Sequence, residues 1–140
     1  MLKFLFAVSL SALIAQLSPS SAQDFPSRAI TMIAPFAAGG GNDVLSRLVA
    51  QPMSDILKQP VIIENLGGAG GAIAAQKLLS APADGYMIFQ GSPNELILAP
   101  LAMKAVKYKP EDFRLVQQIA LAPIAISARK DFPPSNAQEL

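Results

Sequence analysis

The sequence predicts an α/β fold with a mainly parallel sheet. Short apolar runs typical of buried strands alternate with longer segments in which apolar residues recur at helical spacing. Glycine-rich turns join the first two apolar runs to the segments that follow them. This alternation favours parallel strands connected by right-handed crossovers.

Composition excludes several classes of function. The chain has 140 residues, 51% of them hydrophobic, which rules out intrinsic disorder. Eleven basic and 10 acidic residues leave a net charge of +1, so we expect no nucleic-acid partner. Without His or Cys there is no Cys/His zinc site, Ser-His-Asp triad or cysteine nucleophile, and we expect neither a cofactor nor a metal.

Residues 1–22 are predicted to be a secretory signal peptide. A short positive start containing Lys3 precedes an apolar run over Phe4–Leu17, which is short for a membrane span. The small residues Ser20 and Ala22 occupy positions −3 and −1 of a cleavage site after Ala22. We therefore expect an exported product with no stable membrane insertion after cleavage; the alternative is an uncleaved anchor.

The first βα unit is expected to run from a strand at Ala29–Pro35 into a glycine-rich turn at Phe36–Asp43. The turn ends in two good N-cap residues, and a helix follows. Pro52 should kink that helix. Its apolar stripe comprises Val44, Leu45, Leu48, Val49, Met53, Ile56 and Leu57.

The second unit has the same order. Val61–Ile63 lacks polar alternation, as expected for a strand covered on both faces. A second glycine-rich loop follows at Glu64–Gly71. The next helix carries Ile73, Leu78 and Leu79 and should stop near Pro82.

A third strand is expected at Tyr86–Phe89, followed by a helix that opens with a capping box at Ser92–Glu95. Val116–Leu121 and Ile124–Ser127 have the composition of two further strands. A last capping box at Ser135–Gln138 has only two residues after it, so we expect a truncated chain.

Both glycine-rich loops should face one crevice, because ligands of parallel sheets bind beyond the carboxyl ends of the strands. Helix N-termini offer unpaired N–H groups and attract anions, so two such loops can hold a carboxylate without Arg or Lys. Neither loop fits a P-loop, since no Lys follows the glycines. The dinucleotide fingerprint fails as well, because Val44 and Ile73 stand where its third glycine belongs. Plain turn chemistry without a ligand remains open.

Four carboxylates could in principle serve general acid–base chemistry, but structural roles account for all of them: Asp43, Glu64, Asp84 and Glu95. Asp43 belongs to the first turn of a helix, where its charge is favourable. Glu95 is the N3 partner of the capping box at Ser92. These carboxylates therefore do not predict catalysis.

Five blocks together carry a family resemblance: residues 26–31, 35–43, 59–65, 68–71 and 83–86. In this order and spacing they resemble the Bug-type periplasmic solute receptors of tripartite tricarboxylate transporters, the TctC family. The resemblance covers nearly all of residues 24–140. It implies a periplasmic-binding-protein-like lobe of a two-lobed flytrap, with the second lobe largely missing. Residues 23–115 are the first part of the N-terminal lobe, and residues 116–140 hold crossover strands and the start of the second.

By this resemblance the chain is a periplasmic binding protein, not an enzyme. It captures a small carboxylate-bearing solute and delivers it to the membrane components of the transporter. The implied ligand-binding residues are Phe36, Ala37, Gly39, Gly40, Asn42, Asp43, Gly70, Gly71 and Ser92. The rival reading is a small exported hydrolase or transferase that uses a carboxylate in the crevice.

The chain departs from the family pattern after the third strand. Family members commonly read Gly-Thr and then Asn-Pro in this segment, whereas Asn94-Glu95 and Ala99-Pro100 stand here. Glu95 beside the crevice is expected to disfavour a doubly charged anion. The departure leaves the identity of the solute open.

Overall fold

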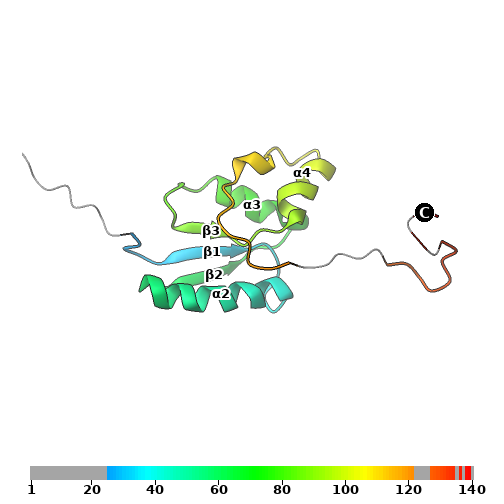
Figure 1. The fold of residues 1–140 in the computed structure, drawn as a ribbon. Coiled ribbons are helices and arrows are strands. Elements are labelled where there is room, and N and C mark those ends of the chain that lie inside the picture. Colours follow the sequence, from blue (N-terminus) through cyan, green and yellow to red (C-terminus); the bar gives the residue numbers. More distant parts are fainter. Residues whose placement is uncertain (1–24, 122–126, 135, 137, 140) are drawn as a thin grey trace, which may run out of the picture.

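A three-stranded parallel sheet forms the centre of the molecule (Figure 1). The computed structural model describes residues 25–121, 127–134, 136 and 138–139; the predicted signal peptide lies outside this part. The strands are β1 (Ile30–Ala34), β2 (Val61–Asn65) and β3 (Met87–Phe89), in the order β2-β1-β3. The three strands predicted first and their parallel direction are thus confirmed.

Helices lie on both sides of the sheet. Helix α2 (Gly41–Leu57) packs against β1 and β2, whereas α3 (Ala72–Leu79) packs against β1 and β3. Figure 1 shows α2 on the opposite side of the sheet from α3 and from α4 (Ala99–Ala102). The crossovers therefore alternate in side, as expected when β1 is the first strand and lies in the middle.

The buried face of α2 differs from the predicted apolar stripe. Its fully buried residues are Asp43, Ser46 and Ala50, which are small or polar. Leu48 and Ile56 of the predicted stripe are 68% and 78% exposed, and Val44 is exposed as well. The other four residues of the predicted stripe, Leu45, Val49, Met53 and Leu57, are half-buried, so the stripe is only partly covered. The helix continues through Pro52 to Leu57.

Strand β2 lies at the edge of the described sheet and differs from its prediction, because only one of its faces is covered by a helix, α2. Ile62 is 54% exposed. In contrast, Ile33 and Ala34 of the central strand β1 are completely buried.

The core beneath α3 is built from small helix residues and rings. Ala72, Ala75, Ala99 and Tyr108 form a buried cluster against which Phe89 and Phe113 pack. After β3 the chain forms a π-helical turn, η2 (Asn94–Leu98), that runs directly into α4. The 3-10 turns η1 (Ala69–Gly71) and η3 (Pro110–Asp112) precede α3 and follow α4. The helix predicted after Ser92 is therefore present, and its first turn is a π-helix.

The segment before β1 is tied to the start of β3. The Tyr86 hydroxyl oxygen accepts a hydrogen bond of 2.8 Å from the Ser27 backbone N–H. Arg28 stacks over the Tyr86 ring at 3.7 Å and pairs with Asp84 at 3.0 Å. These contacts fix the segment before β1 to the start of β3, at the amino end of the sheet.

The prediction of a strand at Val116–Leu121 is wrong. These residues form no strand, and Val116 and Leu121 are each 87% exposed. Of the other two C-terminal predictions, Ile124–Ser127 lies outside the described residues except for Ser127, and Ser135–Gln138 lies outside them at residues 135 and 137. Within the described part of the chain, every helix is too short or too polar to span a membrane.

Candidate functional site

The two glycine-rich loops leave the carboxyl ends of neighbouring strands and touch each other. The Leu66 backbone N–H donates to the Ala34 carbonyl oxygen at 2.9 Å, which extends the β1–β2 pairing to the point where the loops begin. Beyond it, a Cβ placed on Gly67 would lie 3.9 Å from the Ala37 backbone nitrogen. The expectation that the loops lie side by side at one edge of the sheet therefore agrees with the structure.

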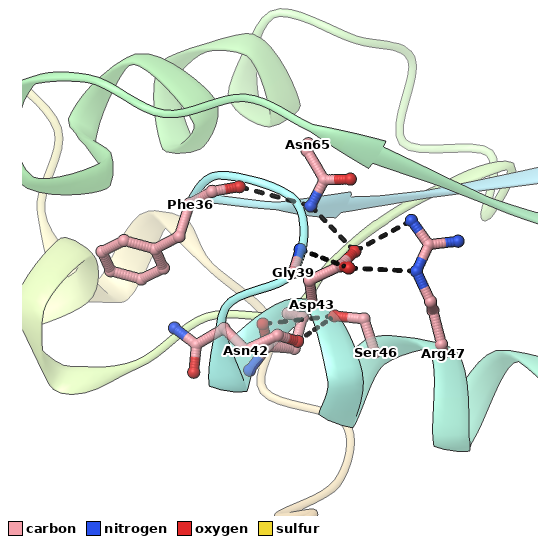
Figure 2. Close-up of polar contacts among 8 residues, drawn as sticks. Phe36, Gly39, Asn42, Asp43, Ser46, Arg47 and Asn65 are labelled. Atoms are coloured by element: carbon pink, nitrogen blue, oxygen red, sulfur yellow. Dashed lines mark hydrogen bonds and ion pairs between the residues drawn. The ribbon is translucent and has the colours of Figure 1, made fainter.

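Asp43 is the centre of a polar network that holds the first loop (Figure 2). Its Oδ2 accepts hydrogen bonds from the Gly39 backbone N–H at 2.9 Å and from Arg47 Nε at 3.0 Å. Its Oδ1 lies 3.0 Å from both Arg47 Nη2 and Asn65 Nδ2. Both oxygens of the buried carboxylate are thus engaged within the protein.

These contacts stabilise the charged form of Asp43. Its pKa falls from 3.8 to about 2, chiefly through the hydrogen bond from Arg47, and then through the Gly39 N–H and the Asn65 amide. The carboxylate therefore stays ionised at neutral pH, and Arg47 offsets its charge.

Asn65 joins the two loops directly. The same amide nitrogen that reaches Asp43 also donates to the Phe36 carbonyl oxygen at 3.3 Å. Figure 2 shows the Phe36 ring turned away from this network, so only its backbone takes part. Because Asn65 ends β2 and Phe36 follows β1, this side chain sets the spacing between the loops.

The first loop leaves its backbone open to the outside. Ala37, Gly39 and Gly40 are exposed, and Gly39 has a φ of +84°. Gly40, not Asn42 or Asp43 as the sequence suggested, is the N-cap residue of α2, and no side chain caps the helix. Asn42 instead supplies its carbonyl oxygen to the Ser46 hydroxyl at 2.8 Å. The first-turn N–H groups of α2 therefore lack partners within the helix.

The second loop approaches α3 through consecutive left-handed residues. Gly70 has φ +60° and ψ +27°, and a Cβ added there would meet no atom within 4 Å. Gly71 has φ +88° and is buried. A Cβ on Gly71 would lie 2.2 Å from Glu95 Cγ, so only glycine fits between the loop and that side chain.

Ser92 and Glu95 close the third strand-to-helix junction. Glu95 Oε2 accepts hydrogen bonds of 2.7 Å from both the backbone N–H and the hydroxyl of Ser92. The Glu95 side chain is completely buried, and its Oε1 has no hydrogen-bond partner among the described residues. The capping role predicted for Glu95 agrees with its bonds to Ser92, while its second oxygen faces Gly71.

The predicted residues thus lie on the three segments that follow the carboxyl ends of the strands. Phe36, Ala37, Gly39, Gly40, Asn42 and Asp43 lie on the first loop and the first turn of α2, Gly70 and Gly71 lie on the second loop, and Ser92 follows β3. Ser92 is linked to the second loop through Glu95, which it hydrogen-bonds and which packs against Gly71.

Two residues that build this site were not among the predicted ones, Arg47 and Asn65. Arg47 follows Asp43 by four residues, a spacing that predicts an ion pair on a helix. Asn65 ends a strand next to the first loop, a position at which a polar side chain can reach a neighbouring loop.

The described residues contain no group of three or more acidic side chains arranged to hold a metal ion. A hollow of about 430 Å³ lies between α3 and the 103–108 segment, lined by residues that include Ile73, Met103 and Val106. None of the predicted site residues lines it. The exposed glycine-rich loops are therefore the candidate site.

The chain is similar to a known protein family and to several curated proteins. Residues 45–140 match the family model of TctC, the tripartite tricarboxylate transporter family receptor. A UPF0065 protein of Bordetella pertussis is 40% identical over 129 residues, which are 92% of this chain and 40% of that relative. The chain thus spans about two fifths of the length of this curated relative.

Solved structures agree with the sequence matches. MatC (Rpa3494) from Rhodopseudomonas palustris, solved with bound malate, is 38% identical with a TM-score of 0.60, over 64% of this chain and 31% of that protein. R. palustris Rpa4515 with adipate is 35% identical with a TM-score of 0.55, over 63% and 29%. A third neighbour, described as a periplasmic transporter, is 42% identical with a TM-score of 0.56, over 61% of this chain and 29% of that protein.

Proposed function

Because the chain belongs to the TctC family of tripartite tricarboxylate transporter receptors, we propose that it binds a small carboxylate-bearing solute in the periplasm. The observation that carries the proposal is the contact between two exposed glycine-rich loops at the carboxyl edge of the sheet. The family is one of receptors rather than enzymes, which argues against the rival hydrolase or transferase.

A carboxylate on the solute is bound by backbone N–H groups of the two loops. The first loop ends at the N-terminus of α2, where unpaired N–H groups and the helix dipole favour an anion. At the start of α3 the N–H groups of Gly71 and Ala72 already donate to the Gly68 and Ala69 carbonyl oxygens, so the second loop contributes its exposed backbone instead. Exposed Gly40 and Gly70 leave no side chain between the solute and these donors. The ligands bound in the two similar structures, malate and adipate, are both carboxylates, which supports this class of solute.

Asp43 and Asn65 position the first loop instead of repelling the solute. Arg47 offsets the charge of Asp43, and the Gly39 N–H and the Asn65 amide occupy its oxygens. An anion that approaches the loop therefore meets the helix end rather than an open carboxylate. Asp43 thus contributes to solute binding through the shape of the loop.

The whole receptor acts as an exported, two-lobed binding protein. Residues 1–22 direct export and are removed after Ala22, residues 23–115 form the first part of the N-terminal lobe, and residues 116–140 lead toward a second lobe. The two lobes close on the solute, and the loaded receptor delivers it to the membrane components of the transporter. The match to transporter receptors supports this role.

Calorimetry on the protein expressed from its complete gene tests the proposal. Monocarboxylates, dicarboxylates and tricarboxylates are titrated into the purified protein, with neutral amides of the same skeletons as controls. We expect at least one acid to bind with a micromolar or lower Kd and its amide to bind at least a hundredfold more weakly.

A folded protein that binds none of these acids contradicts the proposal. Hydrolysis of a generic ester by the wild type, lost in Asp43→Asn, would instead favour the enzyme. Intact-mass measurement of the periplasmic product checks the export step: a first residue of Gln23 is expected, and retention of residues 1–22 contradicts cleavage.

A further inference from the structure

The carboxylate of Glu95 differs from that of Asp43 because it forms no ion pair with any residue that the structure describes. Asp43 has Arg47 at 3.0 Å, whereas none of the described Lys or Arg residues forms an ion pair with Glu95. One of its oxygens, Oε2, is bound twice by Ser92. The other, Oε1, is buried and accepts no hydrogen bond from the described residues. An unpaired buried carboxylate oxygen is costly, so it calls for a functional explanation.

The position of Oε1 connects it to the second loop. A Cβ on Gly71 would lie 2.8 Å from Oε1 and 2.9 Å from Glu95 Cδ, so the carboxylate lies directly against the Gly71 backbone. Gly71 is the N-cap residue of α3, and the neighbouring Gly70 is exposed. The Glu95 carboxylate therefore lies on the inner side of the second loop, and only the loop backbone separates it from the exposed side.

We propose that Glu95 is a specificity-determining residue of the solute site, which favours solutes bearing an ammonium group beside the carboxylate over dicarboxylates that lack one. This inference rests on the proposed function. Buried charges interact strongly across a medium of low dielectric, so Glu95 acts on the solute through the Gly71 backbone without touching it. It weakens the binding of a second anionic group at the α3 end and strengthens that of a cation. The solute class is that of the zwitterionic amino acids.

The rigidity of the junction keeps this charge in place. The Tyr108 hydroxyl, itself buried, donates to the Glu95 carbonyl oxygen at 2.8 Å, and Ser92 holds Oε2. Gly71 leaves the carboxylate no room to turn toward the loop without displacing it. The charge is thus fixed behind the loop rather than free to move into solvent.

Matched pairs of solutes that differ only by the ammonium group test the inference: aspartate and succinate, glutamate and glutarate, alanine and propionate. Their Kd values are measured at pH 7 by calorimetry on the protein expressed from its complete gene. We expect the wild type to bind the amino acid of its preferred pair at least tenfold more tightly than the unsubstituted acid.

Glu95→Gln removes the charge and keeps the shape. Its amide oxygen can stay on Ser92, which leaves an N–H donor where Oε1 lies. We expect this variant to lower the preference for the amino acid at least tenfold. Glu111→Gln, at an exposed carboxylate of η3, is the matched control and should leave the ratio unchanged.

A wild type that binds the unsubstituted acid as tightly as the amino acid overturns the inference, and so does a Glu95→Gln variant with an unchanged ratio. If Glu95→Gln does not fold, Glu95→Asp decides: it keeps the charge, so a retained preference supports the inference and a lost preference overturns it. Absence of any binding by the wild type contradicts the proposed function itself, whereas binding with the wrong ratio contradicts only the role of Glu95.

Discussion

Asn65 Nδ2 lies 3.0 Å from Asp43 Oδ1, and this contact joins the end of β2 to the first turn of α2. The two residues are separated by a whole helix and a strand in the sequence. Their contact brings the first glycine-rich loop against the second, because the same amide also donates to the Phe36 carbonyl oxygen. The geometry of the site therefore depends on a polar contact between elements and not on either loop alone.

Asp43 should make the stability of the protein sensitive to acid. Its pKa is lowered to about 2 from 3.8, so its contribution to folding is fully present above about pH 4 and is lost as the pH falls toward 2. Asp43→Asn should remove this part of the acid dependence and lower the melting temperature at pH 7 by about 2–4 °C for each kcal/mol of stability lost. Thermal melts of both proteins from pH 7 to pH 2 check this. Parallel pH profiles for the wild type and the variant would contradict it.

Asn65→Ala should weaken both folding and binding. Loss of the amide leaves the Phe36 carbonyl and one Asp43 oxygen without that donor, which should lower the free energy of unfolding by about 1 kcal/mol. The loops also lose their link, so we expect at least a tenfold rise in the Kd of the solute. Urea denaturation and calorimetry measure the two effects. Gln51→Ala, at an exposed amide elsewhere on α2, should change neither.

The neighbouring glycines of the second loop should respond differently to substitution. Gly70 has the left-handed conformation that Asn tolerates, and its Cβ position is open. Gly70→Asn should therefore keep the melting temperature within a few degrees while its side chain blocks the solute, raising the Kd at least tenfold. Unchanged affinity would remove the second loop from the site.

Gly71→Ala should mainly affect stability. Its new methyl group would lie 2.2 Å from Glu95 Cγ at a φ of +88°, so strain and overpacking together should cost about 2–4 kcal/mol. Denaturant unfolding measures this cost. A stability equal to that of the wild type would mean that the loop and Glu95 are not packed as described.

Tyr108→Phe tests the support of the third junction. Its hydroxyl is the donor to the Glu95 carbonyl oxygen at 2.8 Å, and both groups are buried. We expect a loss of about 1–2 kcal/mol in the free energy of unfolding, because the carbonyl oxygen keeps its burial and loses its donor. Burial raises the pKa of Tyr108, and the nearby Glu95 charge raises it further, so an ultraviolet titration should place its ionisation above the ordinary value of 10.0. A normal titration would contradict the described packing.

Local patterns predicted the central sheet well and the outer surfaces poorly. The apolar run around Ile33 becomes the buried strand because it has neighbours on both sides. Leu48 and Ile56 fit the helical period, yet the smaller Ser46 and Ala50 occupy the contact with the sheet. Periodicity identifies the apolar side of a helix. It does not show which residues near that side, large or small, will contact the sheet.

The C-terminal prediction failed for another reason. Val116 and Leu121 belong to a segment with strand-like composition, but a strand forms only when a neighbour supplies hydrogen bonds, and the described chain provides none there. At the site, the loops and their helix ends followed from the glycines. The partners Arg47 and Asn65 and the unpaired oxygen of Glu95 depend on side-chain packing, which one-dimensional patterns do not contain.

Because β1 lies in the middle of the sheet, the two glycine-rich loops cannot separate from each other without disrupting the sheet. Its amide and carbonyl groups pair with β2 on one side and β3 on the other, so any opening that exposes Ile33 must break both edges of the sheet. The amide protons of β1 should therefore exchange with solvent only through global unfolding, and they should be the slowest in this part of the chain. A ligand of the loops, present at a hundred times its Kd, would add about 2.7 kcal/mol to the free energy of global unfolding. The exchange rate of a single buried strand would thereby report occupancy of a surface that the strand itself never touches.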